Sequence, residues 1–200
     1  MNVAAVILAG AQSRRFGQLP KAMANLGGTS LIERAIERIS PQVTALAISV
    51  DARNPLFNTY GLHQVEDPEP GSNGPLPALM ASLKWVRDQG QCEWLQLVPC
   101  DSPFFPQDLA GRLVLHAGTS DSRGCTPRFR GEIQPAFGLW HVSLYSAVEQ
   151  AVNSGLAGFK QFLDIHPVSV LDWPEPMAGS PDPFFNINTP AHLQEAIRLI

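Results

Sequence analysis

Long apolar runs and cysteines are both scarce in this sequence of 200 residues. No apolar run approaches the roughly 20 residues that span a bilayer, and the first residues lack the charged-then-apolar layout of a signal peptide. The three cysteines, Cys92, Cys100 and Cys125, form no CxxC pair, which argues against a disulfide framework and against a zinc site. These absences predict a cytoplasmic protein with no membrane partner.

Lysine is scarce as well, with three in the chain, and the formal net charge is −4. This acidic balance gives no reason to expect nucleic acid as a partner. The few cations nevertheless gather in two groups, one with Arg14, Arg15 and Lys21 and one with Arg123, Arg128 and Arg130. Such groups suit a small anionic ligand. For the second group we favour the plainer interpretation that its arginines lie together on the surface by chance.

The residues that are abundant indicate a globular domain. Hydrophobic residues make up 44% of the chain, and its length fits one domain of ordinary size, so we expect a single domain over residues 1–200. Apolar runs of strand length alternate with segments of helical period, which predicts an α/β fold with a mainly parallel central sheet. The expected strands are 3–8, 43–50, 63–65, 93–101, 132–140 and 167–173, and the expected helices are 30–39, 75–90, 106–116, 142–153, 158–164 and 190–200.

Polar residues follow several of the expected strands at the point where each strand ends. Ligands of open parallel sheets bind beyond the carboxyl ends of the strands, so these residues are candidates for a binding site. They comprise the loop after Leu8, the carboxylates Asp51, Asp67 and Asp101, and the asparagines Asn186 and Asn188 of FFNINTP. A basic glycine loop and three carboxylates at one edge suit a polyphosphate held with a metal ion.

The stretch LAGAQSRRFGQLPK, after the first expected strand, has residue types that bind phosphate. Gly10 lets the backbone approach a ligand closely, and Arg15 and Lys21 add positive charge. The stretch has neither the GxxxxGK(S/T) pattern of a P-loop nor the glycine spacing of a dinucleotide-binding turn. Asp101 ends an apolar strand and is a candidate ligand for Mg²⁺, although an aspartate before a proline turn is also a common turn former.

Together these motifs resemble the molybdenum cofactor guanylyltransferases, a branch of the nucleotidyltransferase family. The resemblance covers essentially the whole chain. It rests on LAGAQSRRFGQLPK, VED ending at Asp67, GPL from Gly74, PCDSPF around Asp101 and NINTP from Asn186, in the family's order. It implies a three-layer, Rossmann-like nucleotidyltransferase fold.

The resemblance also implies roles for individual residues. The backbone would contact GTP at Leu8, Ala9, Gly10 and Ala11, the last of which replaces a second glycine of the family. Lys21 would bind the phosphates with help from Arg15, and Asp101 would bind Mg²⁺, which makes these three the catalytic candidates. Asp67 would contact the nucleotide, Asp51 falls near the nucleoside, and Asn186 and Asn188 would line the site near the cofactor phosphate.

The implied reaction is attack by the terminal phosphate of Mo-molybdopterin on the α-phosphorus of GTP, with release of pyrophosphate. A phosphate is ionised near pH 7, so no general base is needed, and the sequence offers no obvious catalytic dyad. Transient contact with molybdenum cofactor pathway proteins or acceptor molybdoenzymes is also implied. Two alternatives stay open: a nucleotidyltransferase with another base or acceptor, such as a molybdopterin cytidylyltransferase, and a non-catalytic nucleotide-binding accessory protein.

Overall fold

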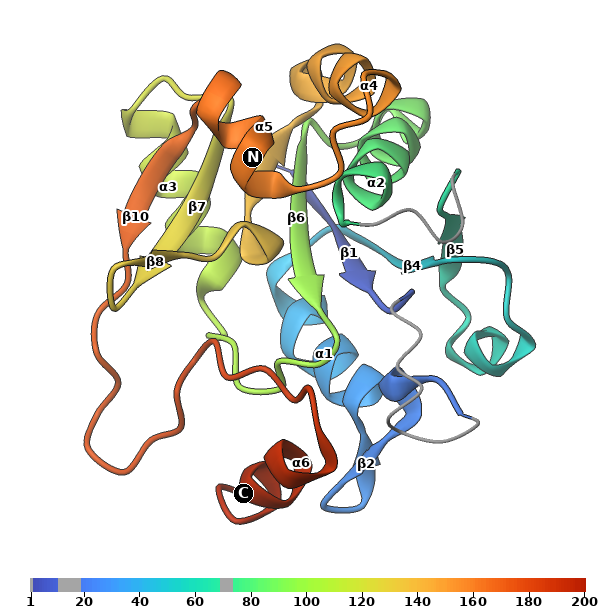
Figure 1. Ribbon diagram of the computed structural model, residues 1–200, viewed down its shortest axis with the longest axis vertical. Helices are drawn as coiled ribbons and strands as arrows, with labels where there is room; N and C mark the ends of the chain where they lie inside the picture. The colour runs from blue at the N-terminus through green and yellow to red at the C-terminus, as the bar shows by residue number, and fades with distance from the viewer. Residues whose placement is uncertain (1, 11–18, 69–73) are drawn as a thin grey trace.

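The computed structural model describes residues 2–10, 19–68 and 74–200, in which one main sheet has helices on both faces (Figure 1). The strand order is β10-β7-β9-β6-β1-β4-β5, and β8 pairs with β7. The strands are β1 (Val3–Leu8), β4 (Ala45–Val50), β5 (His63–Glu66), β6 (Trp94–Pro99), β7 (Gly124–Phe129), β8 (Glu132–Ile133), β9 (Leu139–His141) and β10 (Ser169–Asp172). Strand β1 is parallel to β4 and β6, whereas β9 is antiparallel to β6 and β7. The expected α/β class with a mainly parallel sheet is confirmed.

Two layers of helices sandwich this sheet. The helices are α1 (Leu31–Ile39), α2 (Leu76–Gln89), α3 (Leu109–Thr119), α4 (Tyr145–Asn153), α5 (Phe159–Ile165) and α6 (Pro190–Ile197). Helices α1 and α3 pack into one hydrophobic core, and α2, α4 and α5 into the other. Helix α6 lies apart, against a small hairpin of β2 (Asn25–Leu26) and β3 (Thr29–Ser30) (Figure 1). No helix within the described ranges has the length and apolar character needed to cross a membrane.

Strand β1 shows why the sheet is covered on both sides. Its alternate residues Val3, Ala5 and Ile7 face one core, and Ala4 and Val6 face the other. Side chains of a strand point alternately to the two faces of a sheet, so a strand that is apolar at every position needs cover on both. This continuous apolar run therefore sets β1 at the centre of the sheet.

The helix boundaries follow the capping residues of the sequence. Ser30 accepts a hydrogen bond from the Glu33 amide and, in return, the Glu33 carboxylate accepts from the Ser30 amide, which forms a capping box at the start of α1. The Ser30 hydroxyl also donates to the Glu33 carboxylate, and these bonds from the hydroxyl and then from the Ser30 amide lower the pKa of Glu33. At the end of α2, Gly90 has a positive φ of 66°, a conformation that glycine adopts without steric cost.

Prolines explain two differences between the expected and the observed strands. The expected strand 132–140 is wrong, because Pro135 opens a 3₁₀ turn (Pro135–Phe137) that separates β8 from β9. Strand β7 was not expected, and Pro127 lies within it. The carbonyl oxygen of Pro127 accepts a hydrogen bond of 2.8 Å from the Gln134 amide. Proline removes one backbone donor from a sheet but leaves this acceptor.

Candidate functional site

Lys21, Asp101 and Asn188 meet beyond the carboxyl end of β6. The Nζ atom of Lys21 lies 2.5 Å from Oδ2 of Asp101 and 3.0 Å from Oδ1 of Asn188. Lys21 is 5% exposed, and the side chain of Asp101 is 15% exposed. The structure thus brings together three candidates from distant parts of the chain, and we call them the lysine cluster.

The segment before α6 is hydrogen-bonded to the turn after β6 that contains Asp101. The amide of Ile187 donates a 2.8 Å hydrogen bond to the carbonyl oxygen of Asp101. The Ile187 side chain is fully buried in a small core with Leu26 and Leu31. Upstream, the Phe184 ring packs against Phe137 with 4.9 Å between centroids. These contacts fix the position of Asn188 next to Lys21.

One oxygen of Asp101 is available to a further ligand. Its Oδ1 atom is buried and has no hydrogen-bond partner in the described structure, although burial of a carboxylate oxygen normally requires one. Magnesium is commonly held by one or two carboxylates together with substrate phosphates. The described residues contain no group of three His, Cys, Asp or Glu side chains with the arrangement of a metal site. Asp101 therefore fits a metal ion whose remaining ligands come from a substrate.

Asp51 and Asp67 form a second acidic group at the ends of the neighbouring strands β4 and β5. The amide of Asp67 donates a 2.9 Å hydrogen bond to the carbonyl oxygen of Val50, which keeps the two strand ends together. Burial raises the pKa of Asp51, and the negative charge of Asp67 raises it further. We call these two residues the carboxylate pair.

The backbone of Gly10 lies directly against Asp51 of the carboxylate pair. A Cβ atom at position 10 would lie 2.3 Å from Oδ1 of Asp51 and 3.0 Å from its amide nitrogen. A side chain at position 10 would therefore have to displace the Asp51 carboxylate and would press on its backbone, which favours glycine there. The structure thus brings Gly10, Asp51 and Asp67 together at one edge of the sheet, as the strand-end argument predicts.

The other predicted site residues belong to neither the lysine cluster nor the carboxylate pair. The Leu8 carbonyl accepts a hydrogen bond from the Cys100 amide at 3.2 Å, and the Ala9 amide donates one to the Ser49 carbonyl at 2.9 Å. These two backbone groups therefore already form hydrogen bonds that connect neighbouring strands. Asn186 is exposed. Ala11 and Arg15 lie outside the described residues.

Two arginines of the second basic group of the sequence, Arg128 and Arg130, are paired with carboxylates. Arg128 contacts Asp172 through two hydrogen bonds of 2.6 and 2.8 Å. Arg130 contacts Glu175 at 2.8 Å and Asp182 at 3.4 Å. Both arginines are exposed. These surface ion pairs favour the plainer interpretation of this group and do not indicate an anion site.

Sequence reasoning named Gly74 only as the start of the GPL motif, and it did not single out His192. Gly74 of the GPL motif has φ of 141°, and a Cβ atom there would lie 2.2 Å from the carbonyl oxygen of Ala157. The motif therefore packs α2 closely against the segment before α5. His192 accepts a hydrogen bond from the Asn188 amide through Nδ1, at 3.2 Å. Its position three residues after the N-cap Thr189 was the available signal.

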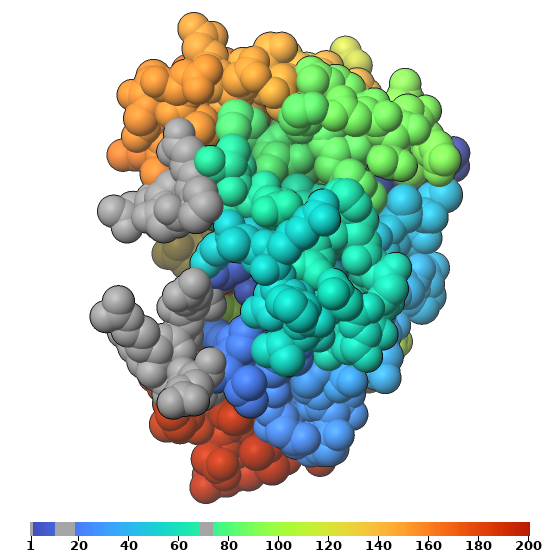
Figure 2. Space-filling view, turned by 90° about the vertical axis from the view of Figure 1, so that its right-hand side faces the viewer, coloured from blue at the N-terminus to red at the C-terminus, as the bar shows by residue number. Residues whose placement is uncertain are grey.

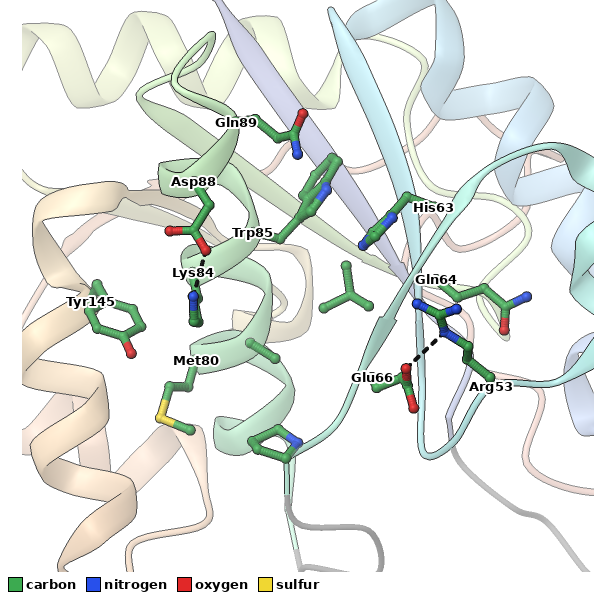
Figure 3. A pocket seen from close by; sticks show the side chains of 13 residues that line it. Arg53, His63, Gln64, Glu66, Met80, Lys84, Trp85, Asp88, Gln89 and Tyr145 are labelled. Atoms are coloured by element: carbon green, nitrogen blue, oxygen red, sulfur yellow. Dashed lines mark hydrogen bonds and ion pairs between the residues drawn. The ribbon is translucent and has the colours of Figure 1, made fainter.

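Figure 2 shows a face on which the C-terminal segment (red) and the residues that follow Lys21 (blue) lie toward one end, and α2 and α4 (green and orange) toward the other. A groove of about 430 Å³ lies between α2 and β5. In Figure 3, His63 and Trp85 face each other there, and the ion pairs Lys84–Asp88 and Arg53–Glu66 flank it. None of these groove residues belongs to the lysine cluster.

Comparisons with known proteins identify the family of the chain. Residues 5–170 match the family model of the MobA-like NTP transferase domain. A molybdenum cofactor guanylyltransferase of Rhizobium meliloti (strain 1021) is 39% identical over 196 residues, which cover 96% of this chain and 89% of the relative. One of Rhodopseudomonas palustris (strain BisB5) is 32% identical over 200 residues and covers 98% and 92%.

The fold is also found in solved structures. Molybdopterin-guanine dinucleotide biosynthesis protein A of Archaeoglobus fulgidus superimposes with a TM-score of 0.77 at 22% identity, over 100% of this chain and 98% of that one. The fold and the full-length relatives therefore agree. The chain belongs to the nucleotidyltransferase family of the MobA-like NTP transferase domains.

Proposed function

We propose that this chain transfers GMP from GTP to the terminal phosphate of Mo-molybdopterin, giving the guanine dinucleotide cofactor and pyrophosphate. The lysine cluster, in a chain with full-length relatives named molybdenum cofactor guanylyltransferase, is the observation that carries this proposal. An oxygen of the acceptor phosphate forms a bond to the α-phosphorus of GTP. The bond from that phosphorus to the bridging oxygen of the β-phosphate breaks, and pyrophosphate leaves with the electron pair.

The lysine cluster supplies the charge that this reaction needs. Two phosphate-bearing substrates must approach each other, and negative charge grows on the departing pyrophosphate. The Lys21 ammonium, buried and fixed by Asp101 and Asn188, supplies one positive charge without reorganising. We propose that Asp101 holds Mg²⁺ through Oδ1, the buried oxygen with no partner in the described structure. When bound, Mg²⁺ would neutralise charge on the phosphate oxygens.

The carboxylate pair lies on the nucleoside side of this arrangement. Gly10 allows the chain to pass close to Asp51, and the same absence of a side chain suits close approach of a nucleotide. We propose that Asp67 contacts the nucleotide and that Asp51 lies next to the nucleoside. Asn186 and Asn188 precede α6, and we propose that they face the acceptor phosphate.

An acid–base dyad has no role in this proposal. The terminal phosphate of the acceptor is already ionised near pH 7, so it attacks without losing a proton to the enzyme. Catalysis then consists of holding the two substrates in line and stabilising charge. We further propose that the reaction takes place in the cytoplasm and that the product passes to acceptor molybdoenzymes or to other proteins of the pathway.

Pyrophosphate release tests the proposal. We expect release when GTP, Mo-molybdopterin and Mg²⁺ are all present, and none when any one is omitted. CTP and ATP in place of GTP test the base. Turnover with CTP would identify a cytidylyltransferase instead, and nucleotide binding without any turnover would identify a binding protein. Either result would overturn the proposed reaction.

A further inference from the structure

The first turn of α6 connects His192 to the lysine cluster. Thr189 is the N-cap, and its Oγ1 accepts from the His192 amide at 3.1 Å. In the opposite direction, the Asn188 amide donates to Nδ1 of His192 at 3.2 Å. The Asn188 amide precedes the helix and donates to no backbone carbonyl of α6. The imidazole of His192 accepts its hydrogen bond instead, as the side chain of a capping residue often does.

The ring of His192 is held in place by an aromatic neighbour. Its centroid lies 5.9 Å from that of Phe185, at an interplanar angle of 62°. Phe185 in turn packs on the buried Phe104 at 6.3 Å. Because Nδ1 accepts a hydrogen bond, the ring carries its proton on Nε2 in this arrangement. The His192 side chain is thus a hydrogen-bond acceptor with a fixed orientation on the short helix α6.

Asn188 transmits this orientation to the cation of the site. Its Oδ1 atom accepts from the Lys21 ammonium at 3.0 Å, and a lysine side chain has several rotatable bonds that such a contact must fix. The Asn188 backbone is held on one side by the neighbouring bond between Ile187 and Asp101, and on the other by His192. Loss of the imidazole acceptor would release the second of these restraints.

We infer that His192 is a positioning residue of the transfer reaction, acting through Asn188 to hold Lys21 against the triphosphate. The inference rests on the proposed function, because it assigns Lys21 to the β- and γ-phosphates of the nucleotide. His192 itself touches no substrate. Its effect is therefore confined to ligands that need Lys21, and a nucleoside monophosphate does not.

Three single variants test this inference by calorimetric titration with GTP and with GMP in the presence of Mg²⁺. His192→Leu should weaken GTP binding about tenfold and GMP binding less than about twofold, because one positioning hydrogen bond is lost. His192→Gln keeps a side-chain acceptor and should recover most of the GTP affinity. The exposed Gln194, on the same helix, offers a matched control, and Gln194→Leu should leave both affinities unchanged.

A double variant shows whether His192 acts through Asn188. In an Asn188→Ala background, His192→Leu should cause no further loss of GTP affinity, since non-additivity is the mark of residues that act on one another. Equal losses for GTP and GMP would indicate general damage to the helix and would overturn the inference. So would a full tenfold loss in the Asn188→Ala background, or unchanged GTP binding in His192→Leu.

These outcomes are distinguishable from failure of the proposed function. If the wild-type chain binds CTP and CMP instead of GTP and GMP, the proposed base is wrong. The ratio of triphosphate to monophosphate affinity then tests His192 with the cytidine nucleotides in the same variants.

Discussion

Lys21 of the first basic group and Arg128 of the second have different environments in the folded protein. Lys21 pairs with Asp101 at 2.5 Å, and Arg128 pairs with Asp172 at 2.6 Å. The first pair has side chains that are 6% and 15% exposed, whereas those of the second are 44% and 71% exposed. The two ion pairs therefore have nearly equal distances, but the Lys21–Asp101 pair is largely buried and the Arg128–Asp172 pair is screened by water. The comparison teaches that burial, more than clustering of cations in the sequence, distinguishes a candidate site from an ordinary surface.

The comparison is tested most strongly by neutralising one carboxylate in each pair. Asp101→Asn should lower the rate of pyrophosphate release roughly 1,000-fold, because several kcal/mol of charge stabilisation disappear with the metal ligand. Asp172→Asn, the matched change at the surface, should alter the rate less than about twofold. Steady-state assays at saturating GTP and Mg²⁺ measure both. Similar rates for the two variants would remove Asp101 from the site.

Removing the cation from each pair should change stability in the same unequal way. Lys21→Met leaves the Asp101 carboxylate in a largely buried place without its ammonium, which should lower the free energy of unfolding by about 3 kcal/mol. Arg128→Met should leave the urea midpoint essentially unchanged. The double variant Lys21→Met with Asp101→Leu serves as a control, since apolar replacement of both partners should recover most of the loss. Equal midpoints for the two single variants would contradict the comparison.

The backbone next to the carboxylate pair should tolerate little change. In Gly10→Ala the new Cβ atom would lie 2.3 Å from Oδ1 of Asp51, and relief of this clash should cost about 2 kcal/mol of stability. Gly111 in α3 is the control, because a Cβ atom there meets nothing within 4 Å. Gly111→Ala should be neutral or should add about 0.5–1 kcal/mol through helix propensity. Thermal unfolding of both variants, followed by circular dichroism, compares them directly.

The sequence predicts those parts of the site that depend on strand ends. The apolar run of β1 predicts a central strand, and parallel strands bring their carboxyl ends to one edge, so Gly10, Asp51 and Asp67 could be assembled before any coordinates. The pairing of Lys21 with Asp101 and Asn188 could not be derived from local patterns. It depends on tertiary contacts between residues 80 and 167 positions apart.

Local chemistry explains the remaining differences between sequence and structure. Pro127 concealed β7, because a strand in the interior of a sheet rarely contains proline. The role of His192 depends on which way its ring turns, and the sequence gives only its place in the first turn of α6. The first difference therefore arises from a residue type that is rare in strands, and the second from the orientation of one side chain.

The smallest expected effect is on the thermal midpoint when Asp51 is neutralised. Asp51 is partly buried and has Asp67 as its neighbour. The pKa of Asp51 is raised above its ordinary value of 3.8 by burial and then by Asp67, so folding favours the protonated form. The resulting stabilisation is complete below pH 3.8 and is lost as the pH rises through the raised pKa. Asp51→Asn should therefore raise the thermal midpoint by roughly 1–3 °C at pH 7 and leave it unchanged at pH 3.

The Asp51→Asn result separates the carboxylate pair from the lysine cluster. Asp101 has the Lys21 ammonium beside it, so neutralising Asp101 should destabilise the protein at pH 7, while neutralising Asp51 should stabilise it. Asp108→Asn, an exposed change at the start of α3, provides the baseline for removing one negative charge from the acidic chain. A gain for Asp51→Asn no larger than this baseline would mean that general charge repulsion, and not the local environment at the ends of β4 and β5, accounts for the effect.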